Sequence, residues 1–166
     1  MIILDQSGKL AIGLARLGKM KLIFENWKRF IREAKELACP ASTQDLKLNT
    51  KNRNAAIKAE HIQYGPLNLA DEDYWVRAAE HWNTTPDVAK KSRCSNCIAF
   101  DISPRMLDCM PGPTSEPIED EEGYLGYCWM HHFKCHSARS CYTWAAGGPI
   151  KEDEKSYEWQ KKNDPS

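Results

Sequence analysis

Cysteines crowd into one short stretch of this chain of 166 residues. Six of the seven lie within 48 positions, namely Cys94, Cys97, Cys109, Cys128, Cys135 and Cys141. A stretch this short buries little apolar surface, so covalent or metal cross-links are the natural source of its stability. In Cys94-Ser95-Asn96-Cys97, two intervening residues allow both thiolates to face one metal centre. Residues 94–141 are therefore predicted to form a small cysteine-ligated metal domain.

Three kinds of cross-link are compatible with these cysteines. Four thiolates can hold an iron–sulfur cluster, cysteines and histidines can hold zinc, or six cysteines can form three disulfides. Zinc favours a second close ligand pair, whereas six and then five residues separate the last three cysteines. Disulfides need an oxidising compartment, and the first twenty residues lack the pattern of a secretory signal. The iron–sulfur interpretation is favoured; zinc, with His131, His132 and His136 as spare ligands, is the alternative, although such histidines are more often solvated.

Three motifs around these cysteines resemble those of the high-potential iron–sulfur proteins. They are Cys94-Ser95-Asn96-Cys97-Ile98-Ala99-Phe100, then Gly126-Tyr127-Cys128, and then Cys141-Tyr142-Thr143-Trp144. Proteins of that family carry one [4Fe-4S] cluster on a CxNC pair followed by an aromatic, a GxC, and a last cysteine with a tryptophan three residues later. The resemblance covers about residues 74–149. It implies four cluster ligands, Cys94, Cys97, Cys128 and Cys141, and three aromatic neighbours of the cluster, Phe100, Tyr127 and Trp144.

The chain departs from that family between its second and third ligands. Thirty residues separate Cys97 from Cys128, roughly double the loop of the family, and they include Cys109 and the acidic run from Glu116 to Glu122. This extra stretch, near 103–123, is predicted to be an inserted acidic surface loop. Cys135 is also extra. Three roles are open to Cys109 and Cys135: they pair with each other, they stay free, or one replaces an assigned ligand.

Aromatic side chains near the proposed ligands are suited to excluding water from a cluster. Exclusion of water makes the more reduced, more negative states of a thiolate-bound cluster costly. Besides the three aromatic residues named above, the candidates are Tyr124, Trp129 and Tyr142, with Tyr74, Trp75 and Trp82 to close the other side. In so small a domain, the same side chains would form the ordinary core.

The rest of the chain is predicted to consist of helices and connecting segments. Apolar residues recur at three- and four-residue steps from Leu22 to Leu37, which predicts an amphipathic helix within an N-terminal segment 1–39. Residues 40–63 are polar and aperiodic and are predicted to be a linker. The cluster domain spans 64–150 and contains two short helices, one after Asp71 and one starting at Thr85-Pro86. Residues 151–166 form a charged tail. The expected fold is small, rich in helices and turns, stapled by metal, and poor in sheet.

Charge and hydropathy narrow the classes of partner. Residues 1–60 carry 12 Lys and Arg against 6 Asp and Glu, which is more typical of a solvated helix face than of specific nucleic-acid binding. The longest apolar stretches are too short to predict a membrane span. Neither a catalytic triad, nor paired catalytic carboxylates, nor a nucleotide loop can be identified, so no enzyme is predicted.

A second resemblance concerns the source of the chain. The start MKLIFENWKRFI, the segment YGPLN and the site RCSNCIAF are similar to small proteins of tailed bacteriophages that carry a domain of this high-potential type. This resemblance implies work in the cytoplasm of an infected cell or in a virion. Two functions are expected: a one-electron carrier, or a structural accessory protein that docks on a protein partner such as a virion assembly.

Overall fold

The computed structural model describes residues 20–29, 38–110, 119–120 and 123–163, in two units, residues 1–38 and 39–166. In the first unit, residues 20–29 are helical, which confirms the first part of the helix predicted from Leu22 to Leu37. The remainder of that helix, 30–37, lies outside the described residues. Large apolar side chains of this helix are exposed, among them Ile23 and Trp27, at 65% and 59%.

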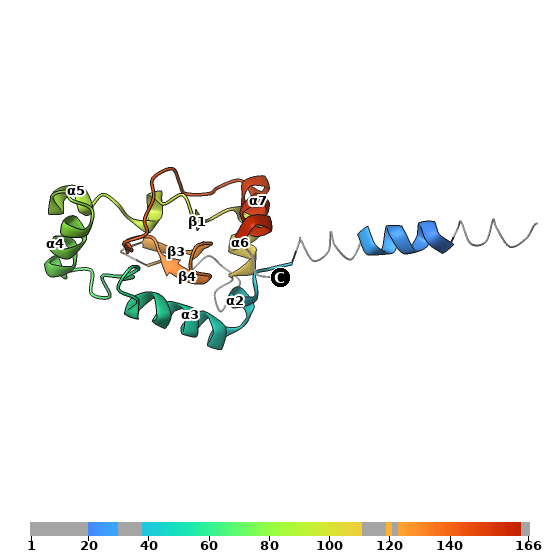
Figure 1. The fold of residues 1–166 in the computed structure, drawn as a ribbon, viewed down its shortest axis with the longest axis horizontal. Helices are drawn as coiled ribbons and strands as arrows, with labels where there is room; N and C mark the ends of the chain where they lie inside the picture. The colour runs from blue at the N-terminus through green and yellow to red at the C-terminus, as the bar shows by residue number, and fades with distance from the viewer. Residues whose placement is uncertain (1–19, 30–37, 111–118, 121–122, 164–166) are drawn as a thin grey trace, which may run out of the picture. The chain divides into compact units, whose positions relative to one another are not determined.

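The second unit is built around a small antiparallel sheet (Figure 1). The strands are β1 (Phe100–Asp101), β2 (Glu119–Asp120), β3 (Gly123–Cys128) and β4 (Phe133–His136), and β3 pairs with the other three. Cys128 lies opposite both Phe100 and Phe133, and Gly126 lies opposite Cys135. Because directly paired residues point to the same face of a sheet, these five positions share one face. The strands are too short, at two to six residues, to give an alternating sequence pattern.

The two faces of the sheet carry two different core clusters. The first cluster contains Cys94, Cys97, Cys135 and Cys141 with Phe100 and Phe133, and Cys128 packs against it. The second contains Tyr127 and Trp129 with the buried residues Met106, Cys109, Met110 and Ile150. Neighbouring residues of β3 therefore enter different clusters, as the alternation of side chains along a strand requires.

The predicted linker 40–63 is wrong, because this segment contains two helices, α2 (Ala41–Gln44) and α3 (Leu46–Lys58). Asp45 caps α3 by accepting hydrogen bonds from the amides of Lys47 and Leu48. Two polar residues of α3 dock on β4 and on the turn before it: the Asn49 side chain accepts from the amide of Lys134 at 2.8 Å, and the Asn52 side chain donates to the carbonyl of His132 at 2.7 Å. Docking through side-chain amides leaves no apolar stripe in the sequence, so the helix could not be recognised there.

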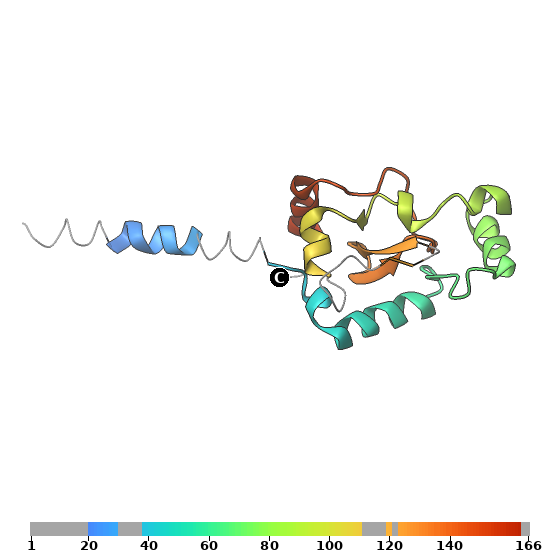
Figure 2. The same cartoon turned by 180° about the vertical axis from the view of Figure 1, so that it is seen from behind.

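The two helices predicted after Asp71 and Thr85 are confirmed as α4 (Glu72–His81) and α5 (Pro86–Ala89). Asp71 accepts from the amide of Tyr74, and the apolar face of α4 forms a third buried cluster with Ala89. Both views show α4 and α5 at one end of this unit and α6 and α7 at the other (Figures 1 and 2).

Two surface segments predicted from the sequence are helices packed on the domain. The region predicted as an inserted loop near 103–123 begins with α6 (Pro104–Cys109), which buries Met106 completely; residues 111–118 and 121–122 lie outside the described residues. The predicted charged tail contains α7 (Asp153–Asn163), whose Trp159 packs against both core clusters. Among the described residues, no helix is both long and apolar enough to span a bilayer.

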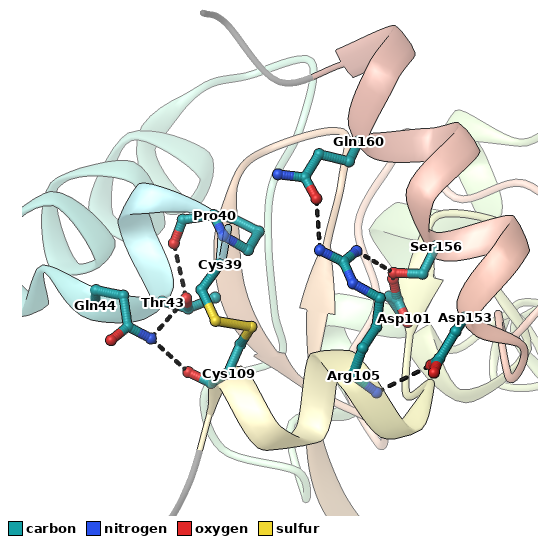
Figure 3. Close-up of a disulfide and its surroundings, with 10 residues drawn as sticks. All are labelled: Cys39, Pro40, Thr43, Gln44, Asp101, Arg105, Cys109, Asp153, Ser156 and Gln160. Carbon is teal, nitrogen blue, oxygen red and sulfur yellow. Dashed lines mark hydrogen bonds between the residues drawn. A yellow bond between two sulfur atoms is a disulfide. The ribbon is translucent and has the colours of Figure 1, made fainter. Parts of the chain in front are cut away.

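A buried polar network holds α7 to α6 and β1 (Figure 3). The Asp101 carboxylate accepts hydrogen bonds from the Trp129 indole and from the Ser156 hydroxyl. The Arg105 guanidinium donates to Ser156 at 2.8 Å and to the Gln160 side chain at 2.6 Å. Because the links to α7 require particular polar atoms on Ser156 and Gln160, the network fixes the helix in one position.

Candidate metal centre

Five cysteines, all unbridged within the described part of the chain, gather on one face of the sheet. Cys94 and Cys97 come from the 3₁₀ turn η1 (Cys94–Asn96) and its end, Cys128 from β3, Cys135 from β4, and Cys141 from the segment after β4. The structure thus brings together all four predicted ligands and adds a fifth thiol. Cys135 forms side-chain hydrogen bonds with Cys128 and Cys94, so it lies inside the group.

The residues of the CxNC motif are held in place by Trp144. Its indole N–H lies 2.9 Å from both the carbonyl of Arg93 and the side-chain oxygen of Asn96. That oxygen also accepts from the amide of Arg93, and the Asn96 amide group donates to the carbonyl of Lys91. Asn96 and Trp144 therefore form one clamp around the first cysteine pair. This contact explains in physical terms why a tryptophan three residues after Cys141 belongs with an asparagine inside the cysteine pair.

Close backbone contact fixes the other side of Cys97. The amide of Ile98 donates to the carbonyl of Ala145 at 2.8 Å, and the backbones of Cys97 and Ala146 form an isolated antiparallel β-bridge. A Cβ atom on Gly148 would lie 1.7 Å from the carbonyl oxygen of Cys97, so only glycine permits this approach. The segment that carries Cys141 and Trp144 is thereby pinned against the first cysteine pair.

Backbone amides donate to two of the sulfur atoms, and a hydroxyl group lies within hydrogen-bond distance of a third. The amides of Ala99 and Ala145 donate to Cys97, and the amides of Met130 and His131 donate to Cys128. The hydroxyl of Thr143 lies 3.2 Å from the sulfur of Cys141. Such donors stabilise a thiolate and, in iron–sulfur proteins, tune the cluster through its sulfur atoms.

Burial sets the protonation of the thiols when no cation is bound. It raises the pKa of Cys97, Cys135 and Cys141, because a thiolate would be poorly solvated there. The pKa of Cys128 is lowered, chiefly by its hydrogen bond with Cys135. Since Cys128 and Cys135 share one hydrogen bond, Cys128 is the first of the pair to lose its proton. Binding of a cation must displace the remaining protons.

Two of the three aromatic residues implied by the resemblance accompany the cysteines. Phe100 is buried in the first cluster, and Trp144 packs against it. Tyr127 does not: it belongs to the second cluster, where its ring packs edge-on against Trp129 at 4.9 Å. The alternation of side chains on β3 separates Tyr127 from its neighbour Cys128.

Tyr64 is a residue of the site that the sequence interpretation missed. In the sequence, its segment is noted only as part of YGPLN, without a link to the cysteines. Tyr64 lies in the cysteine cluster, its ring packs edge-on against Phe133 at 4.8 Å, and its hydroxyl accepts from the amide of His136. Burial, together with nearby Cys135 and Cys94, raises its pKa. Tyr74, which was expected to close the other side, has a raised pKa from burial and from Cys141 and Cys94.

Cys109 pairs with neither Cys135 nor the ligand group. It forms a disulfide with Cys39, with a Cα–Cα distance of 5.5 Å (Figure 3). The suggested Cys109–Cys135 bridge is therefore wrong, since the two residues lie in different core clusters. The side chain of Gln44 donates to the carbonyl of Cys109 at 2.9 Å and ties α2 to the same place.

The three histidines considered as spare ligands are half-buried and hydrogen-bonded. His131 contacts the hydroxyl of Thr143, His132 contacts that of Tyr127, and His136 accepts from the amide of Ala138. Among the described residues, no three His, Cys, Asp or Glu side chains are arranged to hold a single metal ion. A [4Fe-4S] cluster makes a different demand, because each thiolate binds a different iron atom.

The chain matches no protein-family model, no curated protein and no solved structure.

Proposed function

We propose that the second unit binds one [4Fe-4S] cluster through Cys94, Cys97, Cys128 and Cys141, in the manner of a high-potential iron–sulfur protein. One observation carries this proposal: thiols from separate segments gather on one sheet face, with amide donors at two of the four proposed ligands and a hydroxyl within hydrogen-bond distance of a third. Thiols that are merely part of a core have no need of such donors, because a protonated thiol is a weak acceptor.

The chain's own residues would hold, shield and tune the cluster. The clamp of Trp144 on Asn96 orients the first cysteine pair, and the pairing of β3 with β4 positions Cys128. Phe100, Phe133 and Tyr64 surround the sulfur atoms with rings and keep water away. A bound cluster would accept and release single electrons, and a dry shell of this kind disfavours its more negative states.

We propose a one-electron carrier as the first function and an accessory protein of a phage-like assembly as the second. The second function is supported by the helix at 20–29, whose apolar side chains are exposed in a unit separate from the cysteine domain. Such a helix is suited to docking on a protein partner.

The test begins with purification under anaerobic conditions, followed by analysis of iron, sulfide and zinc. We expect four irons and four sulfides per chain and a reversible one-electron transition in a redox titration. Ser substitutions at Cys94, Cys97, Cys128 or Cys141 should abolish incorporation of the cluster. Zinc without sulfide would contradict the cluster, and a cluster without reversible redox behaviour would leave the accessory role.

The fifth thiol provides the control for the choice of ligands. Cys135→Ser should retain the cluster, because the resemblance places Cys135 outside the ligand set. Loss of iron in this variant, with retention in Cys128→Ser, would exchange the roles of these two neighbouring residues.

A further inference from the structure

Thr143 lies between a proposed cluster ligand and a histidine. Its hydroxyl oxygen is 3.2 Å from the sulfur of Cys141 and 2.7 Å from Nε2 of His131. His131 comes from the turn between β3 and β4, whereas Thr143 follows Cys141 by two residues. Two segments that are separate in sequence therefore meet at one hydroxyl group.

The hydroxyl has one proton and cannot donate to both neighbours. A thiolate only accepts hydrogen bonds, so Thr143 must donate to Cys141 whenever that residue is a ligand. Its oxygen must then accept a hydrogen bond from His131, which requires a proton on Nε2. With the proton on Nδ1 instead, Nε2 would attract the hydroxyl proton, and an oxygen lone pair would face the sulfur. The tautomer of His131 thus decides which way the hydroxyl points.

The surroundings of His131 are consistent with a neutral ring whose tautomer matters. Burial lowers its pKa, and nearby His132 and His61 act in the same direction. The ring also lines a pocket of about 380 Å³, together with Asn52, Tyr127 and His132. One edge of the ring therefore faces Thr143 while part of it borders open space that a small molecule can enter.

We propose that His131 is a positioning residue: with its proton on Nε2, it turns the Thr143 hydroxyl toward Cys141 and so raises the reduction potential of a cluster bound there. The proposal rests on the proposed cluster. Hydrogen bonds to ligand sulfur atoms stabilise the more negative, reduced state, which is why losing one should lower the potential. His131 acts only through Thr143, so removing either residue should remove the same contribution.

Reduction potentials of variants test this directly. We expect Thr143→Val and His131→Ala to lower the potential of the cluster, and the double variant to lower it no further than Thr143→Val alone. Thr143→Ser keeps the hydroxyl and His131→Gln keeps an N–H donor, so both should stay near the wild-type value. His132→Ala is the matched control, because it removes the neighbouring ring from the same pocket without touching Thr143. Added imidazole should restore part of the loss in His131→Ala.

A second readout does not use the reduction potential. Nitrogen-15 NMR of the cluster-bound protein should show His131 with its proton on Nε2, and a proton on Nδ1 would overturn the proposal. So would an unchanged potential in His131→Ala alongside a lowered one in Thr143→Val. If the purified protein contains no cluster at all, the proposed function fails; a cluster-bound protein with the His131 proton on Nδ1 contradicts only the role proposed for His131.

Discussion

Gly126 permits the ring of Phe100 to pack on the sheet face that carries Cys128 and Cys135. The ring of Phe100 lies directly over it, so that an added Cβ would come within 2.4 Å of the ring. Gly126 is also paired with Cys135 across β3 and β4. The glycine of the GxC motif is thus explained by contact with an aromatic residue of the first motif, and not by backbone conformation.

Gly126→Ala should destabilise the protein by about 1–3 kcal/mol, because a methyl group would be forced into a filled core. Urea denaturation of the cluster-free protein measures the change. A second substitution, Phe100→Leu in the same chain, should recover part of the loss by removing ring atoms. If Gly126→Ala alone were as stable as wild type, the close contact with Phe100 would not exist in solution.

Asp101→Asn should cost about 1–3 kcal/mol, because a buried donor is left without an acceptor. The carboxylate accepts from Ser103 at one oxygen and from Trp129 and Ser156 at the other. An asparagine has a single acceptor oxygen and cannot serve all three. Asp153→Asn is the control, since the Asp153 side chain accepts from the Arg105 amide at 3.0 Å and asparagine retains an acceptor oxygen. Equal thermal stabilities of the two variants would contradict this account.

At the scale of elements, the sequence predicted those helices whose buried faces are apolar. Tyr74, Trp75, Ala78 and Ala79 mark α4 by their spacing, and Asp71 marks its start. In contrast, α3 docks through Asn49 and Asn52, and α7 buries Ser156 and Gln160. Polar docking leaves no hydrophobic period, so both segments were predicted as a linker and a tail. The four proposed ligands were implied by the resemblance to the high-potential proteins, whereas the entry of Cys135 and Tyr64 into the same cluster depends on strand register and long-range packing.

The disulfide joins the segment just before α2 to the end of α6, which are far apart in the sequence. Cys39 and Cys109 are separated by 70 positions, so the bridge should stabilise the cluster-free protein by up to about 4 kcal/mol through the smaller entropy of the unfolded chain. We expect Cys39→Ser, Cys109→Ser and the double variant to lose similar stability and to keep their iron content. Loss of iron in any of them would connect the disulfide to the metal site.

At the scale of the whole molecule, the two units have different kinds of apolar surface. The second unit buries its large aromatic residues, whereas the helix at 20–29 exposes Ile23, Phe24 and Trp27. Exposed apolar faces of this kind favour association.

Deletion of residues 1–38 should leave the unfolding free energy of the remaining chain unchanged, since Cys39 and both core clusters are retained. Solution mass should also distinguish the proteins: self-association confined to the full chain would identify the helix as a docking element. A marked loss of stability on deletion would show instead that the helix covers the cysteine domain.

The cluster-free protein should lose stability as the pH rises. Cys97, Cys135 and Cys141 have raised pKa values when folded, whereas the unfolded thiols ionise near about pH 8.5. The stability they contribute is present below that pH and declines above it. Cys128, with its lowered pKa, opposes the other three. Urea denaturation at pH 7 and pH 10 checks the sign, and greater stability at pH 10 would contradict it.

Because side chains alternate along β3, the free thiols and the disulfide lie on opposite faces of the sheet. On one face are five reduced thiols, and on the other a bridge made by Cys39 and Cys109. Once the sheet has formed, a thiol on the first face cannot exchange with the bridge by direct attack, because exchange requires sulfur to reach sulfur. Strand pairing therefore keeps Cys39 and Cys109 apart from the other five cysteines. The sheet thus separates the disulfide from the free thiols. A chain oxidised before it folds has no such separation and would accumulate wrongly paired isomers.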